Sequence, residues 1–347
     1  MKKMFSVIAL AALVILFSAR GAHATPMKDA DVDFSGLVQF IYSWDEAGGD
    51  DQLDVQRLRI NLTAKPAEKI TVNASYEVGA NTSGISPTWP FWKAAGARNV
   101  QNDGTADGQI VDLYADFNYL EHVTLRVGQF PLPNSYELNT REYDLETIQY
   151  SQGVGTFGKR DRGGAIFADP TKELSLTGWI VNGDGAITGT SKDDDDRTGV
   201  GLQLDYLPID FFSMKIWGDW DEQASATTSA SDMKEDSFGL GFDYAIHGFH
   251  LFSEYNDMNK KTGGVKTSDI TEWYIHASYR IPSTDLQVVS RFDNYRERNA
   301  GVVLIDQDIT TVGMNWDFEK NARLQIMRDF VEGPKNDKLD MQLAIRF

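Results

Sequence analysis

The sequence contains no cysteine, and this absence excludes a disulfide framework, a thiolate metal site and a redox pair. Histidine is sparse, with five in 347 residues, and none falls in a spacing typical of a metal or hydrolase site. Basic residues are also in the minority, at 33 Lys and Arg against 51 Asp and Glu. Sequence-independent nucleic-acid binding requires clustered Lys and Arg. We therefore expect no catalytic residues, no cofactor, no metal and no nucleic-acid partner.

Long apolar runs are confined to the N-terminus. Two lysines precede an apolar stretch over residues 5–17, and residues 22–24 read Ala-His-Ala, a small-x-small cleavage site. An apolar run of about 13 residues is too short to span a bilayer, which takes roughly 20. The pattern predicts a secretory signal peptide at residues 1–24 and one mature domain at 25–347. Removing the signal takes away three basic residues and no acid, so the formal charge changes from −18 to −21.

The mature chain is rich in a two-residue alternation of apolar and polar side chains. In the last segment, apolar residues at odd positions from 339 alternate with mostly polar residues, and the final residue is Phe347. Such alternation is typical of strands with one apolar and one polar face. We count about sixteen such segments, each near the ~9–11 residues that a tilted strand needs to cross a bilayer. Clear examples are residues 57–63, 70–78, 111–118, 237–244 and 273–281.

The connections between these segments have a regular rhythm. Tight turns are expected near residues 66–68, 119–122, 170–172, 207–209, 246–248, 282–284 and 319–321. Longer polar loops are expected near residues 45–52, 81–108, 131–159, 183–196, 221–235, 257–268, 297–304 and 331–337. Short periplasmic turns that alternate with long extracellular loops are typical of outer-membrane barrels. The predicted fold class is therefore all-β, a transmembrane antiparallel β-barrel of about 16 strands.

In such a barrel the apolar faces contact outer-membrane lipid and the polar faces line the lumen. The aromatic residues at or toward strand ends are candidates for interfacial girdles: Tyr42, Trp44, Trp179, Trp217, Trp220, Tyr255, Trp273, Tyr279 and Trp316. The basic candidates for lining the pore are Arg57, Arg59, Arg126, Arg162, Lys215, Arg280, Arg291 and Arg346. Such side chains set the selectivity of a pore. The alternative is that they pair with lumenal acids such as Asp112, Asp116 and Glu77.

The long loop after the fifth predicted strand is a candidate constriction. It spans residues 131–159, and we expect it to fold into the lumen with Glu142, Asp144 and Glu146 facing basic wall residues. Lys159 and Arg160 complete the candidate set at its end. The alternative is a purely extracellular loop. Residues 153–159 also match a phosphate-binding glycine motif, but Arg160 occupies the place of the Ser or Thr that holds magnesium.

Four consecutive acids at residues 193–196 lie in another predicted outer loop. They form either a solvated charged loop or a divalent-cation site that bridges lipopolysaccharide. The C-terminal strand ending in Phe347 resembles the signal that the barrel-assembly machinery of bacterial outer membranes recognises. Outer-membrane lipid, lipopolysaccharide and this machinery are therefore the expected partners.

Several short motifs, in order along the chain, resemble the phosphate-selective porin O/P family. They are residues 56–62 (QRLRINL), 125–133 (LRVGQFPLP), 160–164 (RDRGG), 181–183 (VNG), 289–293 (VSRFD) and 312–316 (VGMNW). The resemblance implies a trimeric, water-filled channel for small anions, with Arg57, Arg59 and Arg126 as wall candidates. The family often places Lys directly after Gly-Gln-Phe, where this chain has Pro131. This departure leaves phosphate specificity open.

The sequence therefore predicts a porin in the outer membrane of a Gram-negative bacterium. It is expected to be a homotrimer and a non-enzymatic channel for passive diffusion of small ions and hydrophilic solutes, with a preference for anions. Three alternatives stay open: a plugged barrel with a structural or surface-binding role, a barrel enzyme, and a soluble periplasmic β-protein.

Overall fold

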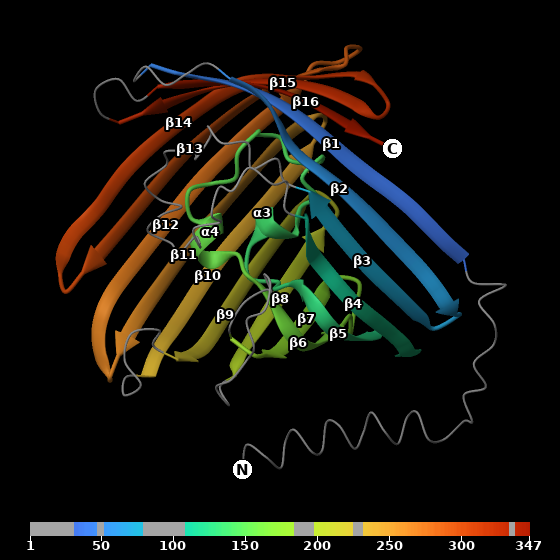
Figure 1. Ribbon diagram of the computed structural model, residues 1–347, viewed down its shortest axis with the longest axis vertical. Coiled ribbons are helices and arrows are strands. Elements are labelled where there is room, and N and C mark those ends of the chain that lie inside the picture. The colour runs from blue at the N-terminus through green and yellow to red at the C-terminus, as the bar shows by residue number, and fades with distance from the viewer. Residues whose placement is uncertain (1–30, 47–51, 79–107, 184–197, 225–231, 333–336) are drawn as a thin grey trace, which may run out of the picture.

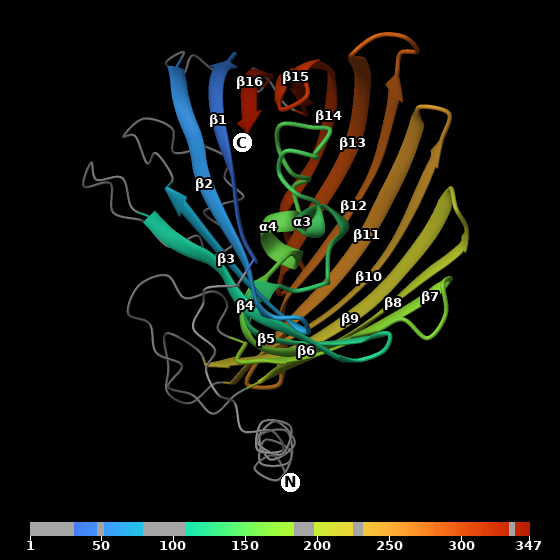
Figure 2. The same ribbon diagram turned by 90° about the vertical axis from the view of Figure 1, so that its right-hand side faces the viewer.

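A computed structural model describes residues 31–46, 52–78, 108–183, 198–224, 232–332 and 337–347. Sixteen antiparallel strands form one closed barrel, in which each strand pairs with its neighbours in the chain and β1 pairs with β16 (Figures 1 and 2). The predicted fold class and strand number are confirmed. The predicted signal peptide at 1–24 and the acidic run at 193–196 lie outside the described residues.

The strands are β1 (Asp31–Asp45), β2 (Gln52–Ala67), β3 (Ile70–Val78), β4 (Gly108–Leu120), β5 (Val123–Pro131), β6 (Arg160–Ala168), β7 (Leu174–Val181), β8 (Gly199–Ile209), β9 (Phe212–Ala224), β10 (Asp232–Ile246), β11 (Phe249–Thr262), β12 (Val265–Arg280), β13 (Leu286–Asn299), β14 (Val302–Glu319), β15 (Ala322–Val331) and β16 (Lys338–Arg346). Two short helices, α3 (Tyr136–Asn139) and α4 (Val154–Phe157), lie between β5 and β6. Among the described residues, neither helix is long enough to cross a membrane.

Alternation along each strand separates an apolar outer face from a polar inner face. On β12, Tyr274, His276 and Ser278 are buried inside, whereas Trp273 and Ile275 are exposed on the outside. Closure of the barrel pairs the backbone N–H and C=O groups of neighbouring strands, as hydrocarbon surroundings demand. The outer face is therefore suited to lipid and the inner face to water or a polar insert.

Some of the aromatic residues predicted for the girdle lie on the outer face, and others do not. Trp220, Trp273 and Trp316 are exposed on the outer face. Trp179 and Trp217 instead point inward and are buried, because each ring lies over a glycine of a neighbouring strand, Gly201 or Gly239. The glycines leave inside the barrel the space that an indole ring needs.

All seven predicted tight turns are present, but two of the predicted long loops are not loops. Residues 257–268 and 297–304 continue as strands up to two-residue turns, Gly263-Gly264 and Ala300-Gly301. All four turn residues have positive φ, between 47° and 82°. This geometry matches the twist of paired strands and favours tight hairpins. The polar residues that suggested loops lie on strands, for example in the Lys261–Asp236 ion pair.

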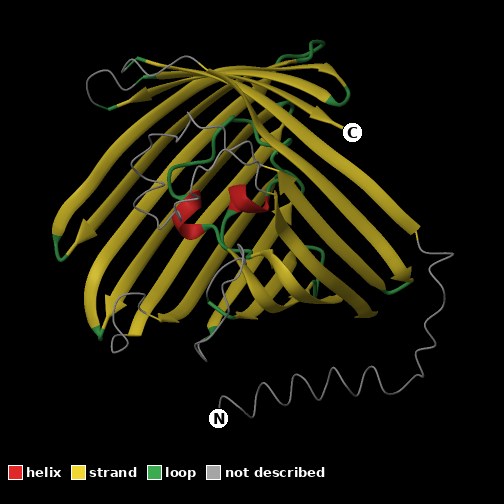
Figure 3. Ribbon diagram, in the orientation of Figure 1, coloured by secondary structure: helices red, strands yellow, loops and turns green. Residues whose placement is uncertain are grey.

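The segment between Pro131 and Arg160, residues 132–159, is described in full and is here called the inner loop. It lies inside the barrel, where α3 and α4 are surrounded by the strand wall (Figures 2 and 3). It contacts β11 to β15 on one side and β2 on the other. The inner loop therefore occupies part of the lumen instead of extending outward.

Candidate constriction of the channel

Two arginines of the barrel wall hold the backbone of the inner loop. Arg291 on β13 donates to the Gln149 and Tyr150 carbonyls at 2.9 and 3.0 Å, and Arg323 on β15 donates to the Tyr143 carbonyl at 2.9 Å. Both side chains are buried. A guanidinium offers five donors in a fixed fork, so one arginine satisfies several carbonyls of an irregular segment. The two arginines therefore fix the path of the inner loop along the wall.

Carboxylates of the same wall satisfy the loop's N–H groups. Glu254 on β11 accepts from the Tyr136 N–H at 2.8 Å, and Glu272 on β12 accepts from the Gly153 N–H at 2.5 Å. Both glutamates are buried. The glycine motif that resembles a phosphate-binding loop thus receives a carboxylate from its own chain.

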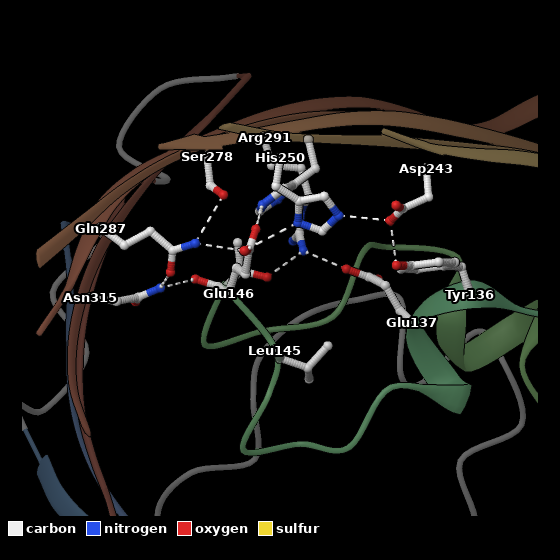
Figure 4. Close-up of polar contacts among 12 residues, drawn as sticks. Tyr136, Glu137, Leu145, Glu146, Asp243, His250, Ser278, Gln287, Arg291 and Asn315 are labelled. Atoms are coloured by element: carbon white, nitrogen blue, oxygen red, sulfur yellow. Dashed lines mark hydrogen bonds and ion pairs between the residues drawn. The ribbon is translucent and has the colours of Figure 1, made fainter. Parts of the chain in front are cut away.

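Glu146 is a loop side chain that contacts three side chains of the wall (Figure 4). Its carboxylate lies 2.6 Å from His276 Nε2, 3.2 Å from His250 Nδ1 and 2.6 Å from Gln287 Nε2. Burial would raise its pKa, but the hydrogen bonds from His250 and His276 outweigh this and hold the pKa well below the usual carboxyl range. Glu146 was expected to face basic wall residues. The structure instead places it against two imidazoles and an amide.

Glu142 lies at the other side of the loop, against β2. Its carboxylate is 2.5 Å from Arg59 Nη1 and 3.4 Å from Arg57 Nη1. Glu77 on β3 also pairs with Arg59, at 2.5 Å. Burial would raise the pKa of Glu142, but the positive charges of Arg59 and Arg57 hold it below its ordinary value. The loop therefore connects opposite walls of the barrel.

Three more of the predicted basic residues, on β5, β6 and β9, each lie beside a carboxylate. Arg126 is 2.8 Å from Asp116, Arg160 is 3.0 Å from Asp112, and Lys215 is 3.7 Å from Asp205. The three basic side chains retain about a fifth of their surface, at 19%, 20% and 20% exposed. The wall thus presents accessible but paired charges, which is the arrangement of the alternative interpretation given above.

The end of the inner loop is held by an acidic group on β9 and β10. The Lys159 ammonium lies 2.8 Å from Glu235 and 3.3 Å from Asp221. Burial would lower the pKa of Lys159, but these carboxylates together with Asp219 raise it above its ordinary value. Lys159 is therefore held charged as an anchor of the loop.

The remaining predicted residues lie near the turns between strands. Arg280 is 2.9 Å from Asp317, and Arg346 is 3.9 Å from Asp144, which is half exposed. Arg346 also stacks its guanidinium 4.4 Å from the Tyr143 ring. A cleft of about 490 Å³ opens here between the loop and the ends of β14 to β16.

The chain is similar to known proteins both in sequence pattern and in fold. The sequence pattern of the family described as Gram-negative porin matches residues 9–335, nearly the whole chain. The chain belongs to the Gram-negative porin family. This porin lies in the outer membrane of a Gram-negative bacterium, and the family match does not extend to the narrower phosphate-selective O/P family.

Solved outer-membrane proteins share the fold of this porin at low sequence identity. Salmonella typhi OmpF in complex with daunomycin has a TM-score of 0.66 and 13% identity, over 91% of this chain and 97% of that chain. The anion-selective porin from Comamonas acidovorans has 0.64 and 14%, over 92% and 99%. The trimer form of Vibrio cholerae OmpT has 0.65 and 10%, over 92% and 99%. No curated protein sequence matches the porin significantly.

One predicted pore-lining residue needs correction. Arg291 faces inward, but it is only 4% exposed because the inner loop covers it, and it pairs with Glu137 and Asp293. Arg291 is thus an anchor of the loop. Arg162 lies on β6 opposite Gln129 of β5, and its role in lining the pore stays a prediction.

Sequence reasoning missed several residues that hold the loop. Arg323, His250, His276, Glu254 and Glu272 all lie on inward-facing positions of strands. The sequence feature that could have identified them is a charged or imidazole side chain at a polar position of an alternating strand. This phase predicts a lumenal position, but it does not separate residues under the loop from residues that face water.

Proposed function

We propose that this porin is a non-enzymatic channel through which small hydrophilic solutes diffuse passively. The observation that carries the proposal is the fixed inner loop inside a closed barrel, beside wall residues that stay partly exposed. Arg126, Arg160 and Lys215 keep about a fifth of their surface although they lie inside the barrel. A lumen narrowed by a fixed segment selects solutes by size and by the field of its wall charges.

The selectivity of the channel is proposed to be weak. On the wall formed by β2 to β6, four arginines each have a carboxylate neighbour. Four positive charges, on Arg57, Arg59, Arg126 and Arg160, therefore face four negative charges, on Glu77, Asp112, Asp116 and Glu142. Paired charges of opposite sign cancel most of their field at the distance of a passing ion.

An anion preference, as the O/P resemblance implies, is the second candidate. One observation favours it: Arg57 approaches its two carboxylates only at 3.4 and 3.9 Å, farther than the contacts of Arg59. Its guanidinium is the one in this group with the loosest pairing. The positive charge of this guanidinium would attract a passing anion.

The assembly of the porin is proposed from the same features. A homotrimer is supported by the likeness to Vibrio cholerae OmpT, an outer membrane protein described in trimer form, and Phe347 directly after β16 supports recognition by the barrel-assembly machinery. Lipopolysaccharide is proposed as a neighbour in the outer leaflet, next to the longer loops.

The deciding experiment is conductance in a planar lipid bilayer under a KCl gradient. A channel of the proposed kind gives stepwise conductance with a reversal potential close to zero. A strongly anion-selective reversal potential would support the second candidate instead. Absence of conductance from correctly folded protein would favour the plugged barrel, in which the inner loop closes the lumen.

A further inference from the structure

The membrane-facing surface of β5 to β9 contains a groove of about 520 Å³. Two rows of paired residues cross the strands beneath it. One row runs through Leu125, Ile166, Gly178, Leu202 and Gly218, and the other through Val127, Gly164, Ile180, Val200 and Trp220. The groove lies where Gly164 and Gly178 interrupt these rows of large apolar side chains.

The packing of the chain does not require glycine at these two positions. A Cβ at Gly164 would meet the Arg126 carbonyl oxygen at 3.6 Å, and one at Gly178 would meet Leu202 at 3.4 Å, both ordinary contacts. Gly163, on the inner face, is different, because its Cβ would lie 2.2 Å from the Ile180 carbonyl oxygen. Glycine in a strand interior is unfavourable and marks sites where another group approaches closely. The fold explains Gly163, whereas Gly164 and Gly178 leave space for something outside the chain.

The lining points to a hydrocarbon occupant. Its outward-facing side chains are aliphatic apart from Trp220 at one end. Arg126 and Trp179 also line it, but their side chains point into the barrel, to Asp116 and to Asp219. A protein partner would bring a polar rim with hydrogen bonds, and the groove offers almost none. The surface around the groove is continuous with the lipid-facing belt of the barrel.

The groove crosses the sheet obliquely. Leu125 and Ile166 lie two residues from the ends of β5 and β6 that meet tight turns, which are periplasmic in such barrels. Ile180 and Val200 lie one residue from the opposite ends of β7 and β8. We propose that the groove over Gly164 and Gly178 holds one acyl chain of a phospholipid, which lies across the strands.

The test is native mass spectrometry of the folded full-length porin in detergent, titrated with dipalmitoyl phosphatidylethanolamine. Gly178→Leu and Gly164→Leu fill the groove from its two rows. Each is expected to weaken retention of one lipid per chain about tenfold, because displacing roughly two methylene groups has this effect. The matched control is Ala277→Leu, which also introduces a leucine on the outer face of β12, away from the groove.

The same spectra report the oligomeric state. Weaker lipid retention in both glycine variants, with the oligomer and the control unchanged, supports the proposal. Equal retention in wild type and both variants overturns it. A change of oligomeric state on filling the groove also overturns it, because the occupant would then be a second copy of the chain. Since a Cβ at Gly164 has ordinary contacts, Gly164→Leu keeps the test available if Gly178→Leu does not fold.

Discussion

Arg59 on β2 lies 2.5 Å from Glu142, a residue of the inner loop 83 positions later in the chain. This ion pair joins the loop to β2, in addition to its anchors on β11 to β15. It also places a negative charge among the arginines that would otherwise attract anions. One contact therefore affects both the position of the loop and the selectivity of the channel.

Replacing Glu142 by Gln is expected to shift selectivity toward anions. The substitution removes one negative charge beside Arg57 and Arg59 while it keeps a hydrogen-bonding group of similar size. The measurement is the reversal potential in a KCl gradient, before and after substitution. Asp144→Asn is the matched control, because Asp144 is half exposed and lies 3.9 Å from Arg346. An unchanged reversal potential in Glu142→Gln would contradict a role for this pair in selectivity.

The double substitution Arg57→Ala and Arg126→Ala is expected to shift selectivity the other way, toward cations. It leaves Asp116 without its 2.8 Å partner and Glu142 with Arg59 alone. Arg296→Ala together with Arg298→Ala also removes two charges, from side chains that are 41% and 40% exposed near the β13–β14 turn, and should leave the reversal potential unchanged. An equal shift in the control would show that net charge, and not lumenal position, determines selectivity.

Arg291 is expected to be the most sensitive anchor of the inner loop. Arg291→Ala leaves Glu137 and Asp293 buried without their partner at 3.1 and 2.8 Å. Removing one partner of a buried ion pair costs about 3–5 kcal/mol. We expect a fluctuating conductance and a lower temperature for the heat-induced mobility shift on gels. Arg280→Ala is the control, since Arg280 is 43% exposed and Asp317 keeps Arg323. Normal stability and steady conductance in Arg291→Ala would argue against the anchor.

Acid is expected to loosen the loop only below the ordinary carboxyl range. The pKa of Glu142 is lower in the folded porin than in the unfolded chain, because Arg59 and Arg57 outweigh burial. Its contribution is therefore complete above about pH 4.3, the usual value for Glu, and is lost as the pH falls through the folded pKa. Channel noise recorded from neutral to acidic pH should rise at the acidic end, and less so in Glu142→Gln. A rise of the same size in the variant would refute the assignment.

Much of this fold is predictable because alternation with a period of two fixes which face each residue takes. Arg57, Arg59 and Arg126 were placed on the inner wall on this basis, and the structure has them there. Arg160 shows the limit of this rule. It shares the phase of the exposed Ile166 on β6, yet at the start of the strand its guanidinium lies 3.0 Å from Asp112 in the lumen.

The contacts of the inner loop were not predictable from the sequence. Glu146 and His276 meet across 130 residues, and no local pattern links them. Their contact depends on the path of an irregular segment through the lumen, which follows from hydrogen bonds to Arg291, Arg323, Glu254 and Glu272 together. Five of the seven tight turns contain a Gly or Pro that marks them, but Gly263-Gly264 was hidden within a polar stretch that resembled a loop.

The last prediction concerns the seam of the barrel, where β1 pairs with β16. Phe347 and Gly36 exchange backbone hydrogen bonds of 2.8 and 3.1 Å, and the Phe347 ring covers Gly36 on the outer face. A Cβ at position 36 would lie 2.3 Å from the ring, so the ring must move in Gly36→Val. Forcing extra atoms into a packed contact costs about 1–3 kcal/mol. We expect a lower temperature for the heat-induced mobility shift and slower refolding into vesicles. The double variant Gly36→Val with Phe347→Ala should recover part of the loss, because the clash is then removed. If the double variant is no more stable than Gly36→Val, the ring and the glycine are not energetically coupled at the seam.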